Sequence, residues 1–282
     1  MLSPKLKDMF AVAKELPAAP QVLSELAELL QDINTETEAI SALLRQDAPL
    51  AAAILRAANS PYYGSGGVGD VDGAINRVGF REVHRLVGYA ATGLLAERAL
   101  IFYGIDPEML REHMIATAFA CELLAERTAF NPRHAYTAGL LRPVGMLVLD
   151  RMARRALAES DIFHLERDSD YATWEGRVME IRNAAVATVV MAEWRFSRDV
   201  IEAVRGHLLT PGAAVPTLPA AVLHLAAGVT EQLGLGLPGE TGYWVPTPEK
   251  LQLAALKPED LERALAETRE KMDQIRLAYS TS

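Results

Sequence analysis

The chain has 282 residues, of which 50% are hydrophobic and 23% charged, the balance of an ordinary globular protein with an ample core. Its formal net charge is −9, which argues against nucleic acid as the main partner, because a duplex-binding surface needs Lys and Arg to displace counterions from phosphates. The single cysteine, Cys121, excludes an internal disulfide, and no apolar run approaches the roughly 20 residues of a membrane helix. With no signal peptide at its start, the sequence predicts a cytoplasmic protein that does not bind membranes.

Helical spacing and capping residues predict several helices in the first part of the chain. Pro4 suits the first position of a helix, and the apolar residues from Val22 to Leu30 recur at helical intervals. Thr35 with Glu38 has the spacing of a capping box, which would open the next helix. An Ala-rich helix over Leu50–Ala58 has small side chains on all sides, so we expect it near the centre of a bundle.

The segment N-S-P-Y-Y-G, residues 59–64, ends this helix, and a glycine-rich connection follows through Gly73. A phosphate-binding loop would need a strand before it and a Lys-Ser/Thr pair after it; both are missing, so we expect a plain connection. Two apolar segments, Ala74–Val78 and Val83–Leu95, then predict further helices, and His84 is expected on the exposed face of the second.

The middle of the chain contains a predicted corner between two helices. Asp106–Pro107 and Asn131–Pro132 are each a helix cap followed by a suitable first residue. The second of these helices leads into Ala138–Asp150, which is almost wholly apolar except for Arg142. Pro143 follows Arg142 and lacks the N–H that a helix interior needs, so the helix should end or bend there and leave Arg142 on the corner.

The remainder of the sequence also predicts helices. They are expected within residues 178–207 and 222–228, from Pro248, and from Pro258 to about Ala278, the last being an amphipathic surface helix. Between them lies a Gly- and Pro-rich loop, residues 233–246, in which Tyr243 and Trp244 are expected to anchor the loop to the body. No stretch alternates as a strand would, so the chain is predicted to be all-α.

Three phrases in this order resemble the HDOD family, the HD-related output domains of bacterial signalling proteins. They are L-P-A-A-P-Q-V (16–22), L-R-A-A-N-S-P-Y-Y-G (55–64) and A-I-N-R-V-G-F-R-E-V (74–83), and the resemblance extends to about residue 233. It implies an N-terminal helical bundle, residues 1–105, packed on an HD-like helical bundle, residues 106–282.

The corner resembles the G-L-L-H-D-I-G-K-L-V-L segment of HD phosphohydrolases, in which the His and Asp are metal ligands. Here Arg142 and Pro143 stand in their place, while His113 lies where HD proteins place their first ligand. Arginine offers no lone pair and proline has no coordinating side chain. The sequence therefore predicts no bound metal, no cofactor and no catalytic residue.

Arg142 leaves three interpretations open. Its cation could replace the charge of the lost metal by pairing with a carboxylate such as Glu180. It could instead bind an anionic ligand, such as a nucleotide phosphate, in a relic cleft formed by His113, Arg142, Glu180 and His207. It could also face water, with His113 and His207 as ordinary hydrogen-bonded core residues.

The resemblance implies a non-catalytic regulatory module that relays a signal by contacting other signalling proteins. With no second module in the sequence, these partners would act in trans. A binding protein for a cyclic nucleotide or another anion is the second hypothesis, and a metal-dependent phosphohydrolase with relocated ligands is the third.

Overall fold

The computed structural model describes residues 4–17, 19–30, 32, 34–64, 67–207 and 217–279. Within these ranges all regular elements are helices and no β-strand occurs; the extended pairing that is present is an isolated bridge between Leu100 and Ile105. The all-α prediction is therefore confirmed. No helix in these ranges has the length and apolar composition that crossing a membrane would require.

The helices follow one another along the chain with short connections. The first group comprises α1 (Pro4–Ala13), α2 (Ala19–Leu29), α3 (Thr37–Leu44), α4 (Ala48–Ala58), η1 (Pro61–Tyr63), α5 (Val71–Val78), α6 (Phe80–Leu95) and η2 (Ile101–Tyr103). The second comprises α7 (Pro107–Ala125), α8 (Pro132–Leu141), α9 (Val144–Ala156), η3 (Glu159–Asp161), α10 (Tyr171–Val178), α11 (Asn183–Glu193), α12 (Arg198–His207), α13 (Leu218–Gln232), η4 (Pro238–Glu240), α14 (Pro248–Ala254) and α15 (Pro258–Tyr279).

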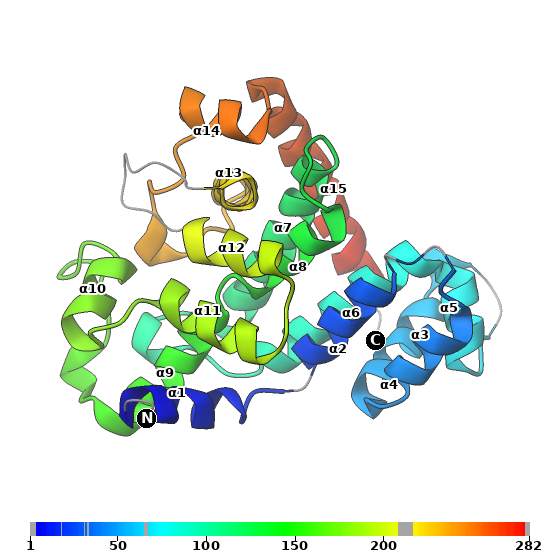
Figure 1. Cartoon of the computed structure of the whole chain (residues 1–282), viewed down its shortest axis with the longest axis horizontal. Coiled ribbons are helices and arrows are strands. Elements are labelled where there is room, and N and C mark those ends of the chain that lie inside the picture. Colours follow the sequence, from blue (N-terminus) through cyan, green and yellow to red (C-terminus); the bar gives the residue numbers. More distant parts are fainter. Residues whose placement is uncertain are drawn as a thin grey trace.

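Helices α7, α8, α12 and α13 pack together in the middle of the molecule, and α15 lies against α7 (Figure 1). Helices α3, α4 and α5 gather on one side, where α4 and α2 contact α6. The first helix, α1, lies away from them and packs on α9 and α11. Segments from both ends of the chain thus surround the central helices.

Side-chain caps fix the starts of some of the helices. The side chains of Asp106 and Asn131 accept backbone N–H groups at the starts of α7 and α8, as the sequence predicts. The predicted capping box at Thr35 is wrong: the N-cap of α3 is Glu36, without a side-chain cap bond. The Thr35 hydroxyl donates instead to the carbonyl of Leu29. A nearby backbone carbonyl thus competes with the capping arrangement for the Thr35 hydroxyl. The resulting bond ties the end of α2 to the start of α3.

Two predictions of burial are also wrong. Helix α4 buries one face, through Leu50, Ile54, Ala57 and Ala58, while Ala52 and Ala53 are only half-buried. His84, expected on an exposed face, is 2% exposed and lies beside Tyr136 of α8, with ring centroids 5.3 Å apart. Helical spacing does not reveal a second packing partner, and α6 contacts α8 on that face.

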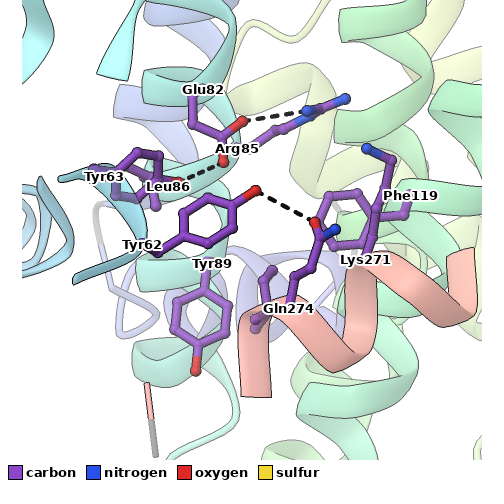
Figure 2. A pocket seen from close by; sticks show the side chains of 10 residues that line it. Tyr62, Tyr63, Glu82, Arg85, Leu86, Tyr89, Phe119, Lys271 and Gln274 are labelled. Atoms are coloured by element: carbon purple, nitrogen blue, oxygen red, sulfur yellow. Dashed lines mark hydrogen bonds and ion pairs between the residues drawn. The ribbon is translucent and has the colours of Figure 1, made fainter. Parts of the chain in front are cut away.

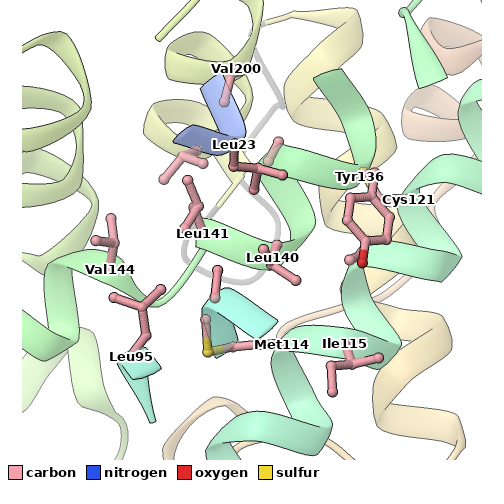
Figure 3. Packing of buried hydrophobic residues seen from close by; sticks show 14 of the residues in the cluster. Leu23, Leu95, Met114, Ile115, Cys121, Tyr136, Leu140, Leu141, Val144 and Val200 are labelled. Atoms are coloured by element: carbon pink, nitrogen blue, oxygen red, sulfur yellow. The ribbon is translucent and has the colours of Figure 1, made fainter. Parts of the chain in front are cut away.

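Most of the buried apolar side chains form one continuous cluster that extends from Met9 to Met272, and Ala227, Tyr243 and Trp244 form a second, small cluster. Figure 3 shows part of it, where Leu140 and Leu141 of α8 and Val144 of α9 meet side chains of other helices. Cys121 is fully buried in this cluster, which confirms it as a core residue. Since the cluster crosses residue 105, the division of the chain there into two bundles stays a prediction.

The corner between α8 and α9 needs glycine on both sides. Helix α8 ends before Pro143, as predicted, and α9 begins after it. A Cβ on Gly139 would lie 2.6 Å from the backbone oxygen of Thr117, and one on Gly145 would lie 2.0 Å from that of Asn183. Both distances are shorter than atoms tolerate, so the glycines allow the corner to pack directly against the backbone of α7 and α11.

We expect Gly145→Ala to lower the free energy of unfolding by about 1–3 kcal/mol or more, since its methyl group would overpack a rigid backbone contact. Gly176→Ala is the matched control: it lies in α10, and a Cβ there meets no atom within 4 Å. Because Ala favours a helix over Gly, this control should be neutral or stabilising by up to about 1 kcal/mol. Urea denaturation measures both, and equal effects would contradict the packing account.

Candidate functional site

Arg142 lies at the C-terminal end of α8, and its side chain points into the protein, where it is 1% exposed. Its guanidinium pairs with Glu240 of η4. Nη1 donates to Oε1 over 2.9 Å, and Nη2 lies 2.9 Å from Oε2. The carboxylate is as buried as the guanidinium, at 2% exposure. Since an unpaired charge is very costly to bury, each group requires the other.

The sequence analysis named Glu180 as an example of a carboxylate that could pair with Arg142, and the structure places Glu180 elsewhere. Glu180 has a positive φ of 56° between α10 and α11, and its side chain is exposed. Glu240 takes the place expected for it. The sequence gives little warning of this pairing, because Glu240 lies 98 residues from Arg142, within the Gly- and Pro-rich loop. The indication available was the predicted anchoring of that loop by Tyr243 and Trp244, which are both buried.

His113 of α7 and His207 of α12 present lone pairs to the same guanidinium. Nδ1 of His113 lies 2.7 Å from the carbonyl oxygen of Leu235, and Nδ1 of His207 lies 2.7 Å from that of Val204. Each Nδ1 must therefore carry the proton, which leaves each Nε2 as an acceptor. Nη2 of Arg142 contacts Nε2 of His113, and Nη1 lies 3.4 Å from Nε2 of His207.

Both imidazoles are held neutral. Burial, followed by the positive charge of Arg142, keeps the pKa of His113 and that of His207 well below the usual value. A neutral imidazole can accept a hydrogen bond from the guanidinium, whereas a protonated one would repel it. The electrostatics and the hydrogen bonds thus both favour the neutral imidazole with its proton on Nδ1.

Trp244 lies against both Arg142 and His207. The guanidinium carbon of Arg142 lies 5.3 Å from the centroid of its ring, and the ring of His207 stacks on it at 5.7 Å with an interplanar angle of 7°. Behind this stack, Nζ of Lys250 donates to Nε2 of His224 over 2.8 Å. Burial lowers the pKa of His224 to about 4, with Lys250 adding to the effect, so this imidazole is also a neutral acceptor.

This arrangement, which we call the arginine centre, comprises His113, Arg142, His207, Glu240 and Trp244. Three of the four residues predicted for a relic cleft come together in it: His113, Arg142 and His207. Their donor set does not fit a metal ion, because N–H groups of Arg142 face both Nε2 lone pairs and the carboxylate already pairs with the cation. In the described parts of the chain, no three His, Cys, Asp or Glu side chains gather as a metal site requires.

A second buried carboxylate, Glu175 of α10, lies near the centre. It accepts hydrogen bonds from the hydroxyl of Tyr103, over 2.8 Å, and from the side-chain and backbone N–H groups of Asn183, over 2.9 and 2.8 Å. Burial raises the pKa of Glu175 to about 7, against the lowering effect of these donors. Glu175 therefore fixes the start of α11, the helix on which Gly145 packs.

The sequence and fold match known proteins. Residues 16–208 match the model of the HDOD domain family. An uncharacterized protein from Treponema pallidum (strain Nichols) is 23% identical over 257 residues, covering 90% of this chain and 49% of its own, so the chain spans about half the length of that relative.

Solved structures share the fold at low sequence identity. An HDOD domain protein of unknown function from Geobacter sulfurreducens is 21% identical, with a TM-score of 0.65 over 97% of both chains. A protein from Marinobacter aquaeolei VT8, described as a candidate signal transduction protein, is 21% identical, with a TM-score of 0.72 over 97% of this chain and 65% of its own. A candidate phosphohydrolase from Shewanella amazonensis SB2B is 22% identical, with a TM-score of 0.61 over 93% of both chains.

We expect Arg142→Ala to lower the free energy of unfolding by about 3–5 kcal/mol, because it leaves Glu240 buried without its cation. Adding Glu240→Gln should recover part of this loss by removing the orphaned charge. Arg198→Ala is the matched control: its side chain is 86% exposed and pairs with Glu202 on the surface, so it should cost about 0.5 kcal/mol or less. Urea melts of the variants give the comparison, and an unchanged midpoint for Arg142→Ala would refute the structural pairing.

Stability should fall as the pH is lowered below about 6.5. The lowered pKa values of His113, His207 and His224 mean that the unfolded chain binds protons there that the folded protein does not, so their contribution is complete above pH 6.5 and lost below it. Glu175 acts in the opposite sense between about pH 7 and 4.5 and offsets one histidine, since its pKa is raised. His113→Gln should reduce the slope of the free energy of unfolding against pH by about 1.4 kcal/mol per pH unit below pH 6, because it removes one of the groups that take up a proton on unfolding. Denaturant melts across this pH range would contradict the account if the slope were unchanged.

Proposed function

This chain belongs to the HDOD family, and we propose that it is a regulatory module that acts through contacts with other proteins and catalyses no reaction. The observation that carries the proposal is the position of the Arg142 guanidinium. It faces the lone pairs of His113 and His207, which a metal-dependent phosphohydrolase would need for its ion, and it is neutralised internally by Glu240.

A hydrolytic centre of the HD type uses its metal to lower the pKa of a bound water and so make a nucleophile. The arginine centre supplies no equivalent group, because a guanidinium stays protonated and has no open coordination position. The description of the Marinobacter aquaeolei protein of the same fold supports a role in signalling. The description of the Shewanella amazonensis protein as a candidate phosphohydrolase makes catalysis the alternative to test.

The same geometry weighs against the second hypothesis, an anionic ligand in the relic cleft. The carboxylate of Glu240 already holds the position such an anion would take on Arg142, and Trp244 covers the guanidinium. An anionic ligand would have to displace the buried carboxylate of Glu240, and this would cost the free energy of the Arg142–Glu240 pair. We therefore place the interaction with partners on the surface of the protein.

We expect the purified protein to bind less than stoichiometric Mn²⁺, Fe²⁺ or Zn²⁺ at this centre and to show no metal-dependent hydrolysis of bis(p-nitrophenyl) phosphate. Elemental analysis after incubation with each metal and a phosphodiesterase assay measure this. The double variant Arg142→His, Pro143→Asp is the comparison, because it returns an imidazole and a carboxylate to the corner and should bind more metal than the unaltered protein. One equivalent of metal in the unaltered protein, together with activity abolished by His113→Ala, would overturn the proposal.

A further inference from the structure

The segment N-S-P-Y-Y-G, residues 59–64, takes no part in the arginine centre and presents the aromatic side chain of Tyr62 to solvent. Oδ1 of Asn59 accepts from the backbone N–H of Val68 over 2.7 Å, and its Nδ2 donates to the carbonyl of the same residue over 2.9 Å. These two bonds tie the start of the connection to its end. The short helix η1 is thereby held in place with the ring of Tyr62 56% exposed.

Tyr62 stands at a small pocket between η1, α6, α7 and α15 (Figure 2). The cavity has a volume of about 60 Å³. Its lining includes Tyr62, Tyr89, Phe119, Lys271 and Gln274. In Figure 2, Gln274 of α15 points toward Tyr62, whose hydroxyl donates to its Oε1 over 3.4 Å, and Lys271 of the same helix lies beside Phe119.

The charged side chains at the pocket differ in how directly they are paired. Glu82 accepts from the hydroxyl of Tyr63 over 2.7 Å and pairs with Arg85 at 3.2 Å. Arg85 also pairs with Glu122. Nζ of Lys271, in contrast, has no hydrogen bond or ion pair within the described ranges, and it lies 5.7 Å from the centroid of the Phe119 ring.

Burial and the neighbouring Arg85 lower the pKa of Lys271, against the opposite effect of Glu122 and Glu82. The half-buried ammonium of Lys271 loses hydration and makes no direct ion pair with any described residue, while Glu82 and Glu122 act on it from a greater distance. An anionic group placed in the pocket would supply that partner. The pocket beside this ammonium therefore suits a negatively charged group.

A shallow groove of about 450 Å³ adjoins the pocket and shares Tyr89 with it. It runs between α4 and α6, and its surface includes the small residues Ala52, Ala53, Ala90 and Gly93. It includes the half-buried face of α4, a helix that the sequence analysis predicted to lie near the centre of a bundle. Arg56 and Arg111 also line the groove, are exposed, and have no ion pair within the residues that the structure describes.

We propose that the pocket and the groove together form a docking surface for an acidic segment of a partner protein, with one carboxylate side chain inserted beside Lys271 and further carboxylates on Arg56 and Arg111. This rests on the proposed function and names the site through which it operates. The pocket, at about 60 Å³, has room for one carboxylate group, and the open groove of about 450 Å³ beside it continues the surface between α4 and α6, as an elongated protein segment requires. Tyrosine and arginine are also the residue types enriched where protein interfaces carry their affinity.

Selection of short random peptides displayed on phage tests this surface without a known partner. We expect the peptides that bind the protein to be enriched in Asp and Glu, with an apolar or aromatic residue nearby. Fluorescence anisotropy with one selected peptide should then show binding that is about tenfold or more weaker in Lys271→Glu, Arg111→Glu and Tyr62→Ala. Lys271→Arg should retain most of the affinity because it keeps the charge.

Lys257→Glu is the matched control for charge. It changes the net charge of the protein by the same amount as Lys271→Glu, it is exposed, and it lies about 20 Å away along α15. It should leave the affinity unchanged, and urea melts of each variant show whether its fold is intact. Selected peptides without acidic enrichment, no binders at all, or equal losses in Lys271→Glu and Lys257→Glu would each overturn the docking surface.

Failure of this inference can be told apart from failure of the proposed function. Metal content and phosphodiesterase activity of the unaltered protein decide whether the arginine centre is catalytic, and neither depends on Lys271. If both are negative while acidic peptides do not bind, the docking surface is wrong and the non-catalytic assignment stands. If the protein hydrolyses phosphodiesters, the proposed function is wrong whatever the peptides show.

Discussion

The buried ion pair between Arg142 and Glu240 imposes the strongest constraint on this fold. Both charged groups lie almost entirely out of water, where their attraction compensates for lost hydration only if the geometry is good and further polar partners are present. The neutral imidazoles of His113 and His207 supply acceptors for the guanidinium, and Trp244 supplies a ring face. Four elements distant in sequence must therefore meet at one corner.

This requirement explains the path of the loop that follows α13. The loop contributes the carbonyl of Leu235 to His113, the carboxylate of Glu240 to Arg142 and the ring of Trp244 to His207. Gly239 packs so closely on Tyr171 that a Cβ there would lie 2.4 Å from the ring. A segment with little regular structure is thus fixed by its contacts with the centre, and in turn it seals the centre from solvent.

The features that could be predicted from the sequence are those set by interactions between residues close together in the chain. The break at Pro143, the caps at Asp106 and Asn131 and the all-α class depend on residues within a turn of one another, and they are confirmed. The partner of Arg142 depends on a contact across 98 residues, which local pattern does not reveal, so Glu240 was not identified from the sequence. The prediction that His84 is exposed failed for the same reason, because its burial is set by α8, a helix elsewhere in the chain.

Helix α7 connects the arginine centre to the docking surface. It carries His113 in the centre, Phe119 beneath the ammonium of Lys271, and Arg111 in the groove. Because a helix is a stiff element, fixing His113 on one face also fixes the positions of the other two. A buried ion pair is weak evidence for stability, and an apolar core could replace it. Its contribution here is positional, since the hydrogen-bonded geometry holds α7 in one register, and the surface presented to a partner depends on that register.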